Sequence, residues 1–167
     1  MRRPFTIVLI VVAASGFLFS ILPAATAADG NQAAPTGVTI PKGYRAWEVV
    51  APSQRDDKDE IRVILGNKTA MKAYRAKTLP FPDGAILAKL AWKRAKSAEF
   101  PDTFVPGAPQ RIEFMVKNAK KYAATGGWGF GRFVDGKPAN EMDHGTCFPC
   151  HQASVKGHDF VFTRYAP

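Results

Sequence analysis

Polar and apolar side chains alternate along the stretch Arg111-Ile-Glu-Phe-Met-Val-Lys117. Ile112, Phe114 and Val116 occupy one set of alternate positions, and Glu113 belongs to the other set. Successive side chains of a β-strand point to opposite faces of the sheet. The alternation therefore predicts a strand with one face in the core and one polar face.

The segments on either side of this strand are short and are separated by glycine and proline. Their composition predicts further strands at 44–50, 60–65, 85–93, 128–134 and 159–165. Short helices are expected at 67–77, with Asn67 as N-cap, at 118–124 and around the two cysteines. Turns are expected at Pro82-Asp-Gly84 and Asp135-Gly136. Together these elements predict an α+β fold, predominantly an antiparallel β-sheet with a few short helices.

The N-terminus has the features of an export signal. Basic residues at positions 2 and 3 precede a long apolar block at 5–22 and the small-residue sequence Ala25-Thr-Ala27. This order predicts a secretory signal peptide at 1–27, cleaved before Ala28, and hence a periplasmic protein. An uncleaved membrane anchor is the alternative, because the apolar block is long. Residues 28–40 lack periodicity and are interpreted as a flexible leader to a single domain at 41–167.

The chain is basic, with 23 Lys and Arg against 14 Asp and Glu and a formal net charge of +9. These basic residues are spread along the chain and do not form a run. Such a distribution is typical of a soluble basic surface. No nucleic-acid signature accompanies the charge, and we expect no nucleic-acid partner.

The only two cysteines, Cys147 and Cys150, are separated by two residues, and His151 follows directly. This spacing is typical of covalent haem attachment, in which each thiol adds to a porphyrin vinyl group and the histidine becomes an axial ligand of the iron. The predicted export signal agrees with this interpretation, since such haems are attached outside the cytoplasm. We therefore expect one covalent haem c per chain.

Three other interpretations of the motif stay open. The cysteines could form a structural disulfide or a thioredoxin-like redox pair. The redox motif normally lies early in a βαβ unit, whereas this one is close to the C-terminus. Zinc could recruit both cysteines with two of His144, His151 and His158, but Cys150 and His151 are adjacent, which does not suit paired zinc ligands.

The sequence also indicates an open sixth position on the iron. No methionine follows His151, and Met71, Met115 and Met142 all precede it. Methionines of this kind are more typical of core packing than of ligation. His144 and His158 are close to His151 in sequence, so a short helix would hold them on its own side of the haem. An open position favours small-molecule chemistry over simple electron transfer.

The chain resembles the cytochrome P-460 family over nearly the whole mature region. The residues that carry the resemblance are Ile40-Pro-Lys-Gly-Tyr-Arg-Ala-Trp47, Glu60-Ile-Arg62, Phe81-Pro-Asp-Gly84 with Lys89 five residues later, Arg111-Ile-Glu113 leading into Lys117, Cys147-Phe-Pro-Cys-His151 and Asp159-Phe-Val-Phe-Thr-Arg-Tyr-Ala-Pro167. The resemblance implies a mostly antiparallel β fold, a homodimer, and a c-type haem ligated by His151. In the family's enzymes a lysine also bonds to the porphyrin rim, and the site oxidises hydroxylamine through nitrosyl intermediates.

The resemblance assigns roles to three further residues. Lys89 matches the lysine that bonds to the haem, Glu113 matches a distal carboxylate that would act as a general base, and Arg62 matches a pocket arginine that could hold a carboxylate or a haem propionate. Without the resemblance, each would be interpreted as a solvated strand residue. Electrons would pass to a periplasmic acceptor.

A sister group, the β-type cytochromes c′, supplies the alternative function. It shares the fold, lacks the lysine bond, and binds nitric oxide in an apolar pocket. The helical-bundle cytochromes c′ also carry the haem motif near the C-terminus, but the alternating strands and the glycine and proline content argue against four long helices.

Overall fold

The computed structural model describes residues 32–166, apart from the side chains of Met142 and Asp143. The predicted signal peptide at 1–27 lies outside the described residues. Within residues 32–166, no helix is long and apolar enough to cross a membrane.

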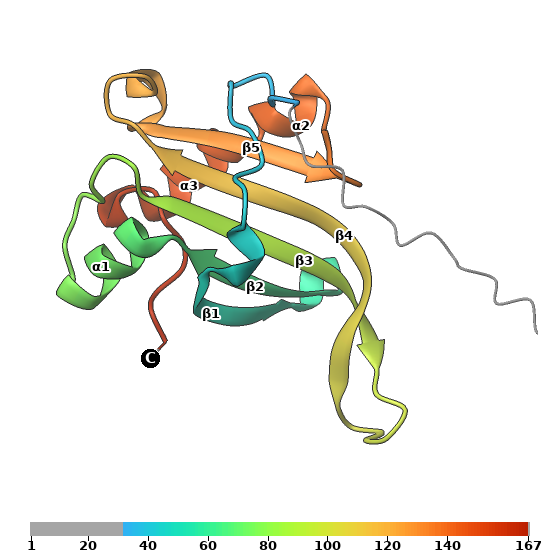
Figure 1. Cartoon of the computed structure of the whole chain (residues 1–167). Coiled ribbons are helices and arrows are strands. Elements are labelled where there is room, and N and C mark those ends of the chain that lie inside the picture. The colour runs from blue at the N-terminus through green and yellow to red at the C-terminus, as the bar shows by residue number, and fades with distance from the viewer. Residues whose placement is uncertain (1–31, 167) are drawn as a thin grey trace, which may run out of the picture.

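Six antiparallel strands form one sheet in which each strand pairs with the next along the chain (Figure 1). The strands are β1 Glu48–Arg55, β2 Glu60–Gly66, β3 Ile86–Lys96, β4 Phe104–Lys117, β5 Trp128–Val134 and β6 Lys137–Pro138. Sequential strands usually lie side by side, and antiparallel pairing of neighbours needs no crossover connection. The predicted α+β fold with a mainly antiparallel sheet is confirmed.

Three α-helices and four 3₁₀ turns complete the described fold. They are η1 Tyr44–Ala46, η2 Asp56–Lys58, α1 Lys68–Ala76, η3 Ala123–Thr125, α2 Glu141–Gly145, α3 Cys147–Val155 and η4 Lys156–His158. The predicted N-cap is confirmed, because the Asn67 side chain accepts a hydrogen bond from the backbone N–H of Ala70 at 2.9 Å. The same oxygen also accepts from the N–H of Ile86 at 3.1 Å, which ties the start of α1 to β3.

Two predicted elements differ from the structure: the first strand begins later than predicted, and the last is absent from the described residues. Residues 44–46 form η1 after Gly43, whose φ of 69° turns the chain, so β1 begins only at Glu48. Residues 159–165 contain no strand. Asp159 and Phe160 have φ values of 47° and 62°, in the left-handed region, where a chain cannot continue as a strand.

Two further differences concern β4 and the segment after it. The strand predicted at 111–117 begins seven residues earlier, at Phe104. Pro106 and Pro109 conceal this extension in the sequence, and it lies in a hairpin where β4 pairs with β3 beyond the end of β5 (Figure 1). The helix predicted at 118–124 is reduced to η3, because the Asn118 side chain accepts from the N–H of Lys121 and forms a local turn.

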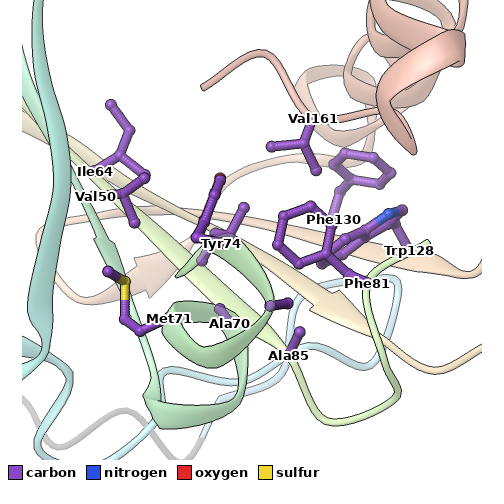
Figure 2. Packing of buried hydrophobic residues seen from close by; sticks show 12 residues of the cluster. Val50, Ile64, Ala70, Met71, Tyr74, Phe81, Ala85, Trp128, Phe130 and Val161 are labelled. Carbon is purple, nitrogen blue, oxygen red and sulfur yellow. The ribbon is translucent and has the colours of Figure 1, made fainter. Parts of the chain in front are cut away.

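Apolar side chains cover both faces of the sheet. On one face, α1 and the C-terminal segment pack into a cluster that includes Met71, Phe81, Trp128 and Val161 (Figure 2). On the other face, Phe114 belongs to a second cluster with residues of the N-terminal segment. The alternation in β4 thus predicted the core face correctly, but its polar face is covered as well.

The N-terminal segment differs from the expected flexible leader. Ala34 and Val38 are buried in the second cluster. The Thr36 hydroxyl donates to the carbonyl of Phe130 at 2.6 Å. In the described part of the leader, residues 32–40 therefore cover the sheet as part of the domain.

We predict that Asn67→Ala lowers the free energy of unfolding by about 1–2 kcal/mol, because one side-chain oxygen serves two backbone donors. Urea unfolding of the two proteins measures the difference. Lys68→Ala, at an exposed neighbouring position, is the control and should change stability by less than about 0.5 kcal/mol. Equal stability of Asn67→Ala and the unsubstituted protein would contradict this role of the cap.

Candidate functional site

The two cysteines lie on the first turn of α3, which confirms the helix predicted there. Cys147 begins the helix and Cys150 follows three residues later, so both lie on the same side of the helix. Pro149 is compatible with this position because the first turn of a helix does not use its N–H groups. The structure records both cysteines as thiols, with Cys147 half-buried and Cys150 exposed.

His151 presents one ring nitrogen for ligation. Its Nδ1 lies 2.6 Å from the carbonyl oxygen of Phe160, to which it donates as the neutral tautomer. This bond leaves the lone pair on Nε2 available to a metal. The rings of Phe130 and Phe162 flank the imidazole, with centroids 5.0 and 4.8 Å away. Burial lowers the pKa of His151, which favours the neutral form that a metal requires.

The other two histidines have structural partners. His144 is buried. Its Nε2 accepts from the backbone N–H of Arg132 at 2.9 Å, and its Nδ1 lies 2.8 Å from the carbonyl of Asn140. His158 Nδ1 lies 3.0 Å from the carbonyl of Val161. Within residues 32–166, no three histidine, cysteine or acidic side chains gather to hold a metal ion, which leaves the zinc alternative without a ligand set.

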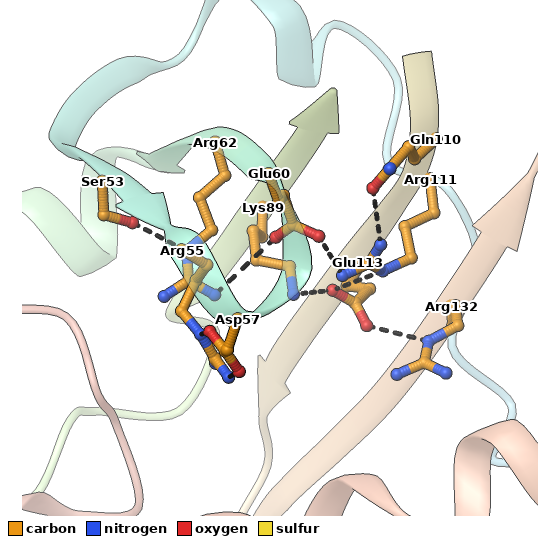
Figure 3. Close-up of polar contacts among 10 residues, drawn as sticks. All are labelled: Ser53, Arg55, Asp57, Glu60, Arg62, Lys89, Gln110, Arg111, Glu113 and Arg132. Atoms are coloured by element: carbon orange, nitrogen blue, oxygen red, sulfur yellow. Dashed lines mark hydrogen bonds and ion pairs between the residues drawn. The ribbon is translucent and has the colours of Figure 1, made fainter. Parts of the chain in front are cut away.

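The register of the sheet brings Lys89 and Glu113 together. Glu113 pairs with Lys89 on one side and with Arg132 on the other, so the three side chains share one face. Lys89 Nζ forms an ion pair with Glu113 Oε2, and Arg132 Nε donates to Glu113 Oε1 at 2.8 Å (Figure 3). Arg111 Nε lies 3.5 Å from Glu113 Oε2. The polar face of β4 is thus a network of ion pairs.

A second carboxylate extends this network. Glu60 is 1% exposed, and its Oε2 accepts from Arg111 at 2.5 Å. Its Oε1 has no hydrogen-bond partner in the described part of the chain, and Arg62 is 3.9 Å away. Arg62 also donates to the hydroxyl of Ser53 at 2.7 Å. Arg62 therefore lies beside Glu60 and joins the network through it.

We call these six charged residues the polar cluster: Glu60, Arg62, Lys89, Arg111, Glu113 and Arg132 (Figure 3). Four are cationic and two are anionic. Burial by itself would raise the pKa of Glu113, but the charge and hydrogen bond of Lys89, followed by the charges of Arg111 and Arg132, lower it to about 2. Burial lowers the pKa of Lys89, and the adjacent Glu113 opposes this effect.

The polar cluster and His151 face the same region. The charges of Lys89 and Glu113 both act on the imidazole of His151 and shift its pKa in opposite directions. Phe130, which contacts His151, lies two residues before Arg132 on the same face of β5. The structure therefore brings together Lys89, Glu113 and His151, which are far apart in the sequence.

Sequence reasoning missed several residues of the site. Arg111 shares the polar face of β4 with Glu113, so the alternation of side chains along β4 could have indicated Arg111 as a site residue. Arg132 is connected to Glu113 only through the pairing of β4 with β5. No sequence pattern indicates the carbonyl of Phe160. Among the aromatic residues, Trp128 and Phe130 lie on the face of the site, whereas Trp92 and Phe133 pack on the opposite face.

These residues fit a c-type haem. The two thiols and the Nε2 of His151 come from one turn of α3, and aromatic rings surround the imidazole. Among residues 32–166, Oε1 of Glu60 has no hydrogen-bond partner, so the polar cluster does not satisfy all of its own polar atoms. Its excess of cationic side chains suits the carboxylates of a haem.

A family model described as Cytochrome P460 matches residues 41–163. The match covers more than half of the chain and includes the polar cluster as well as the cysteine and histidine motif. No curated protein matches the chain. On this match and on the residues described above, the chain belongs to the cytochrome P460 family of haem-binding cytochromes.

Proposed function

We propose that the protein is an exported c-type cytochrome that oxidises hydroxylamine or a related small nitrogen species. The observation that carries the proposal is the Lys89–Glu113 ion pair on the sheet face toward His151. The Lys89 and Glu113 side chains are only 24% and 16% exposed. Burying charges costs free energy, so a pocket that only bound an apolar gas would not need them.

The C-terminal motif would hold one haem per chain through Cys147, Cys150 and His151. Bound there, the haem supplies an iron that takes a small nitrogen ligand and accepts its electrons. The hydrogen bond from His151 to the carbonyl of Phe160 makes Nε2 a stronger donor to that iron. Arg62, at the Glu60 side of the polar cluster, would bind a haem propionate.

Glu113 would accept the protons that the substrate loses along with its electrons. A base has to be ionised to do this, and a pKa of about 2 keeps Glu113 ionised at neutral pH. The same low pKa makes it a weak base as long as the charge of Lys89 remains. Glu113 can therefore become effective if Lys89 loses its charge.

A bond from Lys89 to the porphyrin rim would remove that charge. The neutral Lys89 amine would exchange one N–H bond, and the rim one C–H bond, for a C–N bond. Two protons and two electrons leave in this step, and an oxidant of the peroxide class accepts the electrons. Burial, which lowers the pKa of Lys89, helps to supply the neutral amine. The pKa of Glu113 would then rise, since burial acts in that direction.

Binding of nitric oxide without turnover is the second candidate function. The observation that favours it is the strength of the present ion pairing, since three cations hold Glu113 in its weakly basic state. If Lys89 keeps its ammonium charge, Glu113 would contribute little as a base. The protein would then resemble the β-type cytochromes c′ in function.

We also propose a periplasmic location, a homodimer, and a periplasmic electron acceptor as partner. The location is supported by the basic N-terminus, the apolar block and the small residues before Ala28. The dimer and the acceptor are supported by the family resemblance.

We predict that the haem stays on the polypeptide after extraction with acidified acetone, because the thiols of Cys147 and Cys150 would hold it covalently. The absorbance of the precipitated protein measures the retained haem. Replacing both cysteines with serine is the control and should release it. Complete extraction of haem from the unsubstituted protein would contradict covalent attachment.

We predict that Glu113→Gln slows hydroxylamine oxidation by about a hundredfold, because the amide keeps the shape of the carboxylate and loses the base. Nitric oxide binding should persist, since it requires no proton transfer. Steady-state kinetics and nitric oxide titration measure the two properties.

The matched control for this prediction is Glu48→Gln, since Glu48 forms an ion pair with Arg75 at the exposed surface. It should leave both properties unchanged. Full turnover in Glu113→Gln would exclude Glu113 from the mechanism, and absence of turnover in the unsubstituted protein would favour the nitric oxide binder.

A further inference from the structure

A second buried ion pair lies at the C-terminal end of β4, away from the polar cluster. Lys117 Nζ lies 2.7 and 2.9 Å from the two carboxylate oxygens of Asp159, and the two side chains are 6% and 8% exposed. Lys117 Nζ also donates to the carbonyl of Gly126 at 3.1 Å. The ion pair therefore ties the end of β4 to the C-terminal segment.

Other groups fix Asp159 in place. Its carboxylate accepts from the backbone N–H of Phe81 at 2.8 Å, and its carbonyl accepts from the indole N–H of Trp128 at 2.8 Å. Asp159 has a left-handed backbone with φ of 47°, a conformation that costs free energy outside glycine. The side-chain and backbone bonds together maintain this conformation.

The residue after Asp159 supports the histidine. Phe160 is also left-handed, with φ of 62°, and its carbonyl accepts from His151 Nδ1 at 2.6 Å. Its ring lies so close to Gly126 that a Cβ there would be 2.2 Å from a ring carbon. Lys117 thus binds Asp159 and Gly126, the two residues that locate Phe160.

We propose that the Lys117–Asp159 ion pair positions His151 by holding the carbonyl of Phe160 against Nδ1. The pair thereby sets how strongly Nε2 donates to a bound iron, because the bond at Nδ1 raises the basicity of the ring. An apolar pair could fill the same space without the cost of burying charge, so a role in positioning accounts for the charges. The inference rests on the proposed ligation by His151 and is independent of the hydroxylamine chemistry.

Asp159→Asn and Lys117→Met test the proposal in the full-length haem-loaded protein. Asparagine keeps the shape of the carboxylate and tolerates the left-handed backbone, so Asp159→Asn removes mainly the charge. Resonance Raman spectroscopy of the ferrous protein measures the iron–imidazole stretching band, and redox titration measures the midpoint potential. Both variants should shift the band to lower frequency and raise the potential, because a weaker bond at Nδ1 makes Nε2 a poorer donor.

Asp59→Asn is the control, because it removes another lysine–aspartate pair, Lys93–Asp59 at 2.9 Å, at the other end of β3. It should leave the band and the potential unchanged. If the single variants do not fold, the double variant Lys117→Met/Asp159→Asn is measured in the same way, since it leaves no buried charge unpaired.

An unaltered band and potential in the variants that fold would overturn the inference, whatever their stability. If the unsubstituted protein shows no iron–imidazole band, the ligation by His151 is wrong and the inference fails with it. The two failures are therefore distinguishable.

Discussion

The ion pair between Lys89 and Glu113 is the interaction on which the proposed chemistry depends. It forms because β3 and β4 pair in the register that sets these two residues side by side. Buried charges require partners, and the other residues of the polar cluster supply them. Arg132 and Arg111 surround Glu113, and Glu60 binds Arg111. A shift of β4 by one residue in this register would turn Arg111 and Glu113 to the other face, into the second apolar core.

The site combines residues of the sheet with residues of a helix and the turn that follows it. The sheet supplies the polar cluster through its register, whereas α3 and the left-handed turn after it supply the cysteines, His151 and the carbonyl that supports it. Specific contacts join these parts. Phe130 of β5 meets the ring of His151, and Lys117 of β4 meets Asp159. The position of His151, the proposed haem ligand, therefore depends on β4 and β5 as well as on α3, which carries it.

Local patterns in the sequence predicted what depends on local geometry. The spacing of Cys147, Cys150 and His151, the cap at Asn67 and the core face of β4 all follow from one turn of helix or from alternation along one strand. Arg132 and Glu60 were not predicted as site residues, because pairing between strands that are distant in the sequence determines their partners. The strand predicted at 159–165 failed because its composition resembles a strand, while Asp159 and Phe160 are held in left-handed conformations by contacts with Lys117, Phe81 and Trp128.

The charge of Lys89 distinguishes the two proposed functions. With the charge, Glu113 is a weak base, as in the proposed nitric oxide binder; without it, the pKa of Glu113 would rise and the carboxylate could act as the base of the proposed hydroxylamine oxidation. Tandem mass spectrometry of haem peptides from the native protein tests this most directly. We expect one haem that joins the peptide containing Cys147, Cys150 and His151 to the peptide containing Lys89. A haem peptide that carries only the two cysteine thioethers, together with unmodified Lys89, would contradict it.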